Sequence, residues 1–515
     1  MTKQRRRGEA PGADQNGAGA RGRAAVEALI ARGRNAPMQA TDYDTSWALR
    51  LAGPDGQPEY PHLARRLVDR QRADGSWGGQ IPHPHDRLLT TLSVVIALSG
   101  IDGSEARGAR TAGEHYLRAH LGDLGPESDR TIGFELIFPS LLEEASALGL
   151  DLPFGAGERL KRERAAKLAL LPEDIFSSHT TALFSLEAFR DDLDVEGAAR
   201  LLLENGSMAN SPSATASLMG RIPNWRGRFP ASAAYLDLML EGPDPGLPAV
   251  YPCDIFVPAW TLYYLQHGGL FEENRDLLRP YLDHLEENVW PNGVWFASAS
   301  GSVDSDDTAV SLLVLHRAGY EVDGSLLLRF EADRWFSAHE HESNPSVSAN
   351  LHALEALEVI PAEHRVRVRD KILGHLLDIR RGGAYWRDKW HASAYYPTTR
   401  ALPALSEHAP GEVGPTLDWL LRTQRPDGSW GEFAPTTEET SLVLLSLLQS
   451  HRTTTSLPAG PMRRAAAFLL ENEGVPEDGY PELWMGKSLY APVFAIEAVR
   501  LSALALYEDT FGGVP

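Results

Sequence analysis

The chain has 515 residues, a formal net charge of −21 and a hydrophobic share of 43%, which suits a globular protein of two to four domains. The acidic balance argues against a nucleic-acid-binding surface, because such a surface needs a basic footprint. The single cysteine, Cys253, excludes an internal disulfide framework, and the absence of an apolar run of about 18 residues predicts no membrane span and a cytoplasmic location.

The N-terminal stretch differs in composition from the rest of the chain. Residues 1–23 are rich in Gly, Ala and Arg and lack the apolar centre of a secretion signal, so they are predicted to form a disordered tail. Residues 24–44 are predicted to form a segment that packs on the second of two domains, with a helix at 24–33.

Three similar phrases recur along the chain, each with an Asp-Gly or Asn-Gly turn, a tryptophan and a following helix headed by acidic residues. Their tryptophans are Trp77, Trp295 and Trp430, and their helices begin near Asp86, Asp304 and Glu438. Glycine permits the turn, and acids suit a helix N-terminus. Apolar residues between the phrases recur at helical spacing, and alternating strand patterns are almost absent. These patterns predict an all-α fold of two α/α barrels, at 45–285 and 286–515.

Three carboxylates stand together at the head of the second of these helices, in Asp304-Ser-Asp306-Asp307. A solvated helix cap is one interpretation, but the helix that follows is apolar on nearly every face, which favours a buried start. Like charges held close cannot all ionise, so one carboxyl is expected to stay protonated. A protonated carboxyl in a dry aromatic cavity can protonate an alkene, and aromatic faces stabilise the carbocation that results. The 12 tryptophans and 15 tyrosines fit that need.

Residues 304–309 resemble the Asp-x-Asp-Asp-Thr-Ala motif of the class II terpene cyclases, which start cyclisation by protonation. The phrases at 71–77 and 424–430 resemble the QW repeats of that family, and squalene–hopene cyclases carry both features. The branch that takes linear prenyl diphosphates is favoured by four further segments, at 43–48, 86–92, 132–143 and 484–490. The resemblance covers about 43 to 490. It implies a γ domain at 45–285 inserted into a β domain at 286–515, with the active site between them.

The resemblance also implies roles for the acids and for two residues on a later helix. Asp306 would be the proton donor, and Asp304 and Asp307 would tune and hold it. Asn350 and His352 would hydrogen-bond Asp306 and aim its proton.

The base that ends cyclisation differs from that of the plant ent-copalyl diphosphate synthases. Their histidine position falls at Phe184, and their asparagine position falls near His352. The terminating step, and hence the product, is therefore expected to differ.

Candidate residues for the diphosphate and for Mg²⁺ come from the same resemblance. Asp123 and Glu127 stand where the family has an acidic Mg²⁺ motif, and carboxylate oxygens suit that ion. Lys167 aligns with a lysine that contacts diphosphate, and Lys487 has a similar position in its motif. The other residues expected at the substrate are Lys389, Trp390 and Tyr490.

The function expected from these features is cyclisation of geranylgeranyl diphosphate to a bicyclic, copalyl-like diphosphate. The diphosphate is expected to survive, because the nearest string to the class I Asp-Asp-x-x-Asp motif ends in Val195 instead of Asp. The alternative is a sesquiterpene cyclase that converts farnesyl to drimenyl diphosphate. Two further hypotheses are a squalene–hopene-type cyclase and a zinc-dependent prenyltransferase-like barrel. The expected partners are a small prenyl diphosphate and a downstream class I terpene synthase or phosphatase, without nucleic acid.

Overall fold

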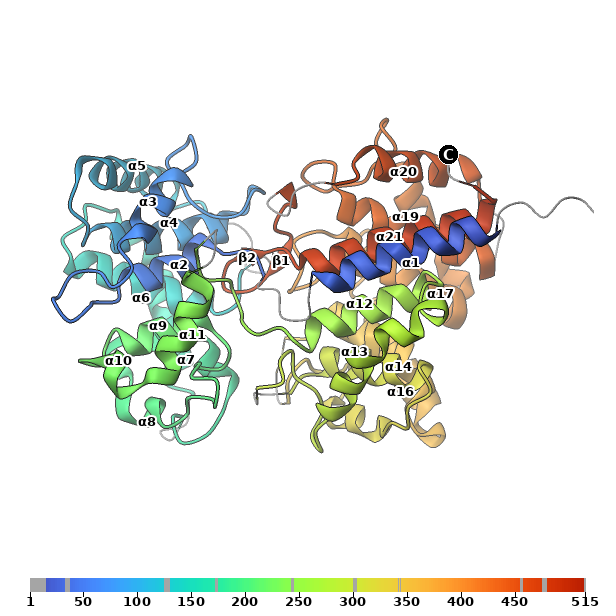
Figure 1. The fold of residues 1–515 in the computed structure, drawn as a ribbon, viewed down its shortest axis with the longest axis horizontal. Coiled ribbons are helices and arrows are strands. Elements are labelled where there is room, and N and C mark those ends of the chain that lie inside the picture. The colour runs from blue at the N-terminus through green and yellow to red at the C-terminus, as the bar shows by residue number, and fades with distance from the viewer. Residues whose placement is uncertain are drawn as a thin grey trace, which may run out of the picture.

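The computed structural model describes residues 15–32, 38–124, 130–171, 175–241, 245–299, 303–340, 342, 344–453, 457–474 and 479–513. The chain forms two helical lobes that lie side by side, and Figure 1 shows one short hairpin of strands between them. The predicted all-α fold is confirmed. None of the described helices is both long and apolar enough to cross a membrane.

The first lobe is a barrel with an inner ring and an outer layer of helices. Its inner ring contains α2 (Asp42–Leu49), α4 (Pro84–Leu98), α6 (Phe134–Ala147), the 3-10 segment η3 (Thr181–Asp192) and α9 (Pro212–Met219). Each of these contacts the next and α9 contacts α2, so the ring is closed. The outer layer contains α3 (His62–Asp69), α5 (Ser104–His120), η2 (Phe154–Gly157), α7 (Glu158–Leu168), α8 (Val195–Ala199), α10 (Trp225–Arg228) and α11 (Pro230–Leu240).

The second lobe repeats this plan with a larger ring. Its inner helices are α12 (Phe256–His267), α14 (Ser305–Arg317), α15 (Val347–Glu355), α17 (Tyr395–His408), α19 (Thr437–Thr453) and α21 (Val493–Phe511). Their contacts follow this order and close from α21 back to α12. The other elements are η4 (Glu272–Asn274), α13 (Arg275–Glu287), η5 (Gly324–Phe330), η6 (Ala356–Glu358), α16 (Ala362–Asp378), η7 (Pro410–Glu412), α18 (Val413–Arg422) and α20 (Ala459–Glu471).

The boundary between the barrels lies earlier than the predicted 285/286. The core of the first barrel runs from Tyr43 to Leu247, and the core of the second includes the chain from Val250 onward. Helices α12 and α13 therefore belong to the second barrel, where α12 closes the ring between α14 and α21. The predicted boundary was wrong because it was set by the tryptophan turns, and α12 precedes the first such turn of its own barrel.

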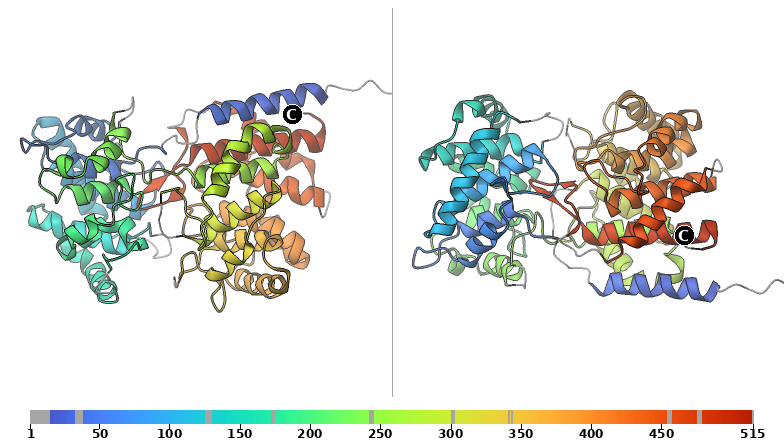
Figure 2. Two further views of the ribbon diagram at one scale, coloured as in Figure 1. Left: turned by 60° about the horizontal axis from the view of Figure 1, so that its bottom comes forward. Right: turned by 90° about the horizontal axis from the view of Figure 1, so that it is seen from above.

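Helix α1 (Gln15–Ala31) lies along α21 on the outside of the second barrel, as Figures 1 and 2 both show. Val26 and Leu29 enter the core of that barrel. The helix begins at Gln15, so the disordered tail predicted up to residue 23 is too long; residues 1–14 lie outside the described part of the chain.

The repeated turns share one hydrogen-bonding scheme. In each, a backbone N–H donates to a threonine hydroxyl in the helix that follows, and the pairs are Trp77–Thr91, Met208–Thr215, Val294–Thr308, Trp386–Thr398 and Trp430–Thr440. The copies at Met208 and Trp386 were missed in the sequence. The copy near residue 295 uses Val294 instead of the expected Trp295, so that Trp295 is free to face elsewhere.

A hairpin of β1 (Trp484–Met485) and β2 (Leu489–Tyr490) reaches from the second barrel to the first (Figure 1). The Ile132 N–H donates to the Gly486 carbonyl at 2.8 Å, and the Leu489 N–H donates to Asp86 Oδ1 at 3.0 Å. The hairpin therefore connects the two lobes by its backbone.

Candidate active site

A cavity of about 180 Å³ lies between the two barrels. Its wall is mainly aromatic and contains Phe184, Phe256, Trp260, Trp295, Phe296, Trp390, Trp484 and Tyr490. Asp304, Asp306 and Asp307 also line it, and the first barrel contributes Ile132, Thr181 and Phe184. The sequence brings acid and aromatic side chains together here because α12 and α14 both begin at this cavity.

Asp304 is the N-cap of α14. Its Oδ1 accepts the backbone N–H groups of Asp306 at 2.8 Å and of Asp307 at 2.7 Å, which are otherwise unpaired at a helix start. Burial raises the pKa of Asp304, although the nearby His339 and the hydrogen bonds oppose the shift. Asp304 thus fixes the backbone that carries the other two acids.

Asp307 lies beside Asp304 in the first turn of α14. Burial raises its pKa well above the usual value, and the charge of Asp304 and the contact with it raise the pKa further. Its Oδ1 is buried without a hydrogen-bond partner. A neutral Asp307 beside a charged Asp304 avoids two buried like charges.

Asp306 is the acid that connects the cavity to a histidine. Its Oδ1 lies 2.5 Å from His352 Nδ1 on α15, and both side chains are buried. Its Oδ2 has no hydrogen-bond partner among the described residues, and the carboxyl lines the aromatic cavity. The carboxyl is therefore held on one side and presented to the cavity on the other.

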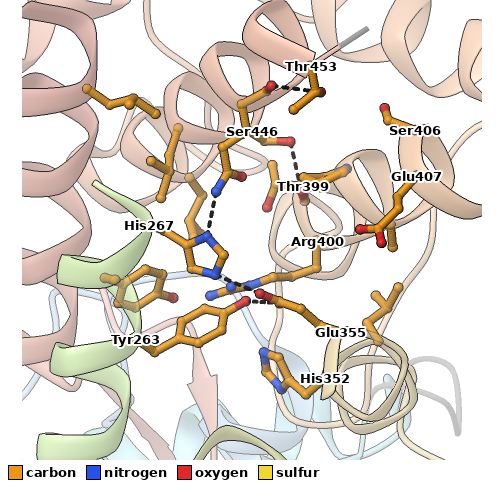
Figure 3. Close-up of a pocket in the computed structure, with 18 of the residues that line it drawn as sticks. Tyr263, His267, His352, Glu355, Thr399, Arg400, Ser406, Glu407, Ser446 and Thr453 are labelled. Atoms are coloured by element: carbon orange, nitrogen blue, oxygen red, sulfur yellow. Dashed lines mark hydrogen bonds and ion pairs between the residues drawn. The ribbon is translucent and has the colours of Figure 1, made fainter. Parts of the chain in front are cut away.

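His352 separates this cavity from a second one of about 570 Å³ inside the second barrel. Figure 3 shows this cavity with His352, Tyr263, His267, Glu355 and Arg400 around it. His352 Nε2 is buried and has no hydrogen-bond partner in the described part of the chain, and His352 lines this second cavity. The imidazole thus has one nitrogen on Asp306 and a second nitrogen available at the inner cavity.

Several charged and polar side chains lie in the wall of the inner cavity. Glu355 Oε1 lies 2.8 Å from His267 Nε2 and 3.1 Å from Arg317 Nη1. Burial alone would raise the pKa of Glu355, but His267 and Arg317 hold it well below its usual value. Volume and polarity suit a space that holds water.

Asn350 is not in contact with Asp306, contrary to the expectation from the sequence. Its side chain accepts the Phe336 N–H at 2.8 Å and donates to the carbonyls of Phe336 and Ser346 at 2.8 Å. It therefore holds the loop before α15 in place, and through that loop it helps to position the helix that carries His352.

The predicted substrate residues divide between the cavity and its surroundings. Trp390 and Tyr490 line the cavity, and burial raises the pKa of Tyr490. Lys389 binds Glu342 and donates to the Asn344 carbonyl at 2.7 Å, with its ammonium 5.1 Å from the Trp390 ring. It is therefore close to the wall without being part of it.

The two other predicted lysines have different environments. Lys487 is fully buried, and its ammonium donates to Glu187, Ser211, Ser213 and the Phe184 carbonyl at 2.6–2.8 Å. These contacts saturate its donors, so it fastens the hairpin to the first barrel. Lys167 pairs with Glu135 and is 53% exposed, which leaves it accessible to an anion.

The predicted Mg²⁺ ligands are not assembled in the described part of the chain. Asp123 is 74% exposed and has His120 as its neighbour, while Glu127 lies outside the described residues. Among the described residues, no group of three His, Cys, Asp or Glu side chains is arranged to hold a metal ion. The described residues therefore do not complete the predicted Mg²⁺ site.

Part of the aromatic wall was not predicted from the sequence. Phe256 and Trp260 are spaced four apart on α12, a pattern that places both on one helix face and could have indicated a shared site. Trp484 stood inside a matched segment but was not singled out. Cys253 also lines the cavity, and burial raises the pKa of its thiol well above the usual value, so it adds a neutral, weakly polar group.

Comparisons with known proteins identify relatives along nearly the whole chain. A type B diterpene cyclase of Mycobacterium tuberculosis is 35% identical over 496 residues, which cover 92% of this chain and 96% of that protein. A copalyl diphosphate synthase of Streptomyces cyslabdanicus is 31% identical over 506 residues, with 90% of each chain covered. The solved structure of an ent-copalyl diphosphate synthase from Streptomyces platensis is similar at a TM-score of 0.77 and 33% identity, covering 95% of this chain and 99% of that one. No protein-family model matches the chain.

Proposed function

The chain belongs to the bacterial class II diterpene cyclases and is therefore an enzyme of protonation-initiated cyclisation; from this premise we propose that Asp306 protonates the terminal alkene of geranylgeranyl diphosphate to give a bicyclic, copalyl-type diphosphate. The names of the relatives, diterpene cyclase and copalyl diphosphate synthase, support a C20 substrate. The observation that carries the proposal is the contact of Asp306 with His352 at the edge of an aromatic cavity.

The bond changes balance as an isomerisation. The Asp306 proton adds to the terminal alkene, two carbon–carbon bonds close in turn, and a proton leaves the last carbocation to form a new alkene. The diphosphate takes no part in these steps. Aromatic faces such as those of Trp260 and Trp484 stabilise the cationic intermediates without attacking them.

Asp304 and Asp307 would keep a proton available beside Asp306. Burial raises the pKa of both carboxyls, which favours a proton shared within the cluster. Asp306 is the preferred donor because it combines the free Oδ2 at the cavity with a basic partner on Oδ1.

His352 would return a proton to Asp306 after each turnover. One of its nitrogens lies on Asp306, and the other has no hydrogen-bond partner among the described residues and lies at the inner cavity (Figure 3). A neutral imidazole can accept a proton on one nitrogen and release it from the other. Asp306 would then be recharged from the side away from the substrate, so water need not enter the aromatic cavity.

Mg²⁺ would accompany the substrate diphosphate as a counter-charge, with Asp123 and Glu127 as the acids that the family resemblance assigns to it. The described residues form no metal site, so no step of the reaction is assigned to the ion. Lys167, which is half-exposed beside Glu135, is the lysine proposed to contact the diphosphate.

The direct test is product analysis of the purified protein with geranylgeranyl and farnesyl diphosphates in separate reactions with Mg²⁺. After dephosphorylation, gas chromatography with mass spectrometry should find a bicyclic C20 alcohol from the first substrate and none from Asp306→Asn. A bicyclic product from the C15 substrate alone would replace the proposal by the sesquiterpene alternative. Unchanged prenyl alcohol from both would refute it.

A further inference from the structure

The acidic pair that begins α19 has no role in the reaction described above. Glu438 and Glu439 stand in the third repeat phrase and are both buried, Glu438 with 4% exposure. Neither side chain lines the aromatic cavity. A buried carboxyl this close to a site for carbocations needs a physical account.

Glu438 is bound by two N–H donors. Its Oε1 accepts the indole N–H of Trp484 at 2.8 Å and lies 3.3 Å from His391 Nε2. The Ser393 N–H donates to His391 Nδ1 at 3.1 Å, so Nε2 carries the imidazole proton and donates to Glu438. Among the described residues, its Oε2 is buried without a hydrogen-bond partner.

Trp484 is the element that joins this carboxylate to the cavity. Its ring lines the cavity together with Asp306. Its orientation is set by rings packed around it, with centroid distances of 5.5 Å to Phe256, 4.8 Å to Tyr396 and 5.3 Å to His391. The indole N–H points into the wall toward Glu438, and the ring therefore reaches the cavity as a fixed aromatic surface.

The helix N-termini at the cavity give a carboxylate at position 438 an electrostatic role. Helices α12 and α14 begin at the cavity, and the partial positive charge of a helix N-terminus disfavours a carbocation. A carboxylate at the start of α19 opposes that field. A charged acceptor on the indole N–H also shifts electron density toward the ring, which strengthens the attraction between its face and a cation.

We propose that Glu438 is a positioning residue that acts through Trp484: it holds the indole in place and raises the electron density of the face that stabilises the later carbocations. His391 contacts the same carboxylate oxygen, Oε1, and so helps to hold it toward the indole. This inference rests on the proposed cyclisation. In that reaction, Trp484 would stabilise the carbocations that follow protonation.

The test is steady-state kinetics and product analysis of Glu438→Gln, which keeps an acceptor for the indole and removes the charge. We expect kcat to fall about tenfold with KM unchanged, and a larger share of products that end after one ring. Glu438→Asp, which restores the charge, should recover part of both.

Glu439→Gln is the matched control. Glu439 is buried at the same helix start but accepts from Ser393 Oγ at 2.5 Å and Thr436 Oγ1 at 2.7 Å. It should lower thermal stability and leave the product ratio as in the wild type. The same product shift in this control would overturn the inference, because any buried charge at this helix end would then suffice.

Trp484→Phe tests the same hydrogen bond from its other end and serves if Glu438→Gln does not fold. It should raise the share of one-ring products, and adding Glu438→Gln to it should change that share no further. If the wild-type enzyme is active and either Glu438→Gln or Trp484→Phe gives the wild-type product ratio, the role proposed for Glu438 is refuted while the proposed function stands. An inactive wild type with both substrates would instead refute the proposed function.

Discussion

Helices α4 and α14 begin in the same way, each after a glycine turn and each with a buried aspartate in its first turn, yet they treat that acid differently. Asp86 on α4 accepts the Gly79 N–H at 2.8 Å on one oxygen and the Leu489 N–H at 3.0 Å on the other. Asp306 on α14 binds His352 through one oxygen and leaves the other at the cavity.

The two aspartates differ in how many of their carboxyl oxygens accept a hydrogen bond from the protein. A carboxylate with both oxygens occupied by N–H groups stabilises the fold and has little reason to exchange a proton. A carboxyl with one free oxygen at an aromatic cavity can give its proton away. Glu439 on α19 belongs with Asp86, because Ser393, Thr436 and the Glu432 N–H all donate to it.

The largest expected effect is the loss of kcat on changing Asp306, which should not occur on changing Asp86. Asp306→Asn should lower kcat at least 1,000-fold, because it removes the transferable proton while keeping the size of the side chain. The measurement is product formation by gas chromatography, with circular dichroism to establish that the variant folds. Substantial activity in a folded Asp306→Asn protein would assign the proton to Asp304 or Asp307.

The next effect concerns His352, the hydrogen-bond partner of Asp306. His352→Asn should lower kcat roughly 100-fold, with a deeper loss as pH rises, because reprotonation of Asp306 then depends on water alone. The check is a pH–rate profile beside His375→Asn, which changes a buried histidine on the outer helix α16. Equal profiles for the two variants would contradict a proton-transfer role for His352.

Asp86→Asn should lower the stability of the fold and leave the catalytic rate nearly unchanged, the opposite of what is expected for Asp306→Asn. An amide can accept only one of the two N–H groups, so unfolding should become easier by about 2 kcal/mol, or roughly 5 °C in Tm. Calorimetry measures the shift, and activity per folded molecule should stay within roughly twofold of the wild type. A loss of kcat without loss of stability would place Asp86 in the reaction.

The smallest effect tests the proton held by Asp307. Its raised pKa means that the folded protein keeps a proton that the unfolded chain releases above its ordinary value near 3.9. That stabilisation is complete at low pH and declines as pH rises toward the folded-state pKa. Asp307→Asn has no such dependence, so its Tm should gain steadily on that of the wild type as pH rises from about 4 toward the folded-state pKa of Asp307. A constant difference would show that Asp307 is not protonated in the folded state.

Much of this arrangement could be predicted from the sequence, and the rest depends on contacts across the fold. The acid cluster at 304–307 and the helical repeats were visible, since both are local patterns. The different environments of Lys487 and Lys167 were not, because burial of Lys487 depends on Glu187 and two serines far away in the chain. Asn350 and His352 are two residues apart, and only the side chain that faces α14 reaches Asp306.

The position of the hairpin at 484–490 in the chain also affects when the active site can be completed during synthesis. It follows every helix of the first barrel and all helices of the second except α21 along the chain. A chain emerging from the ribosome therefore has its acid cluster well before Trp484 and Tyr490 can complete the wall around it. The acid cluster is therefore synthesised before the aromatic wall that encloses it can be completed.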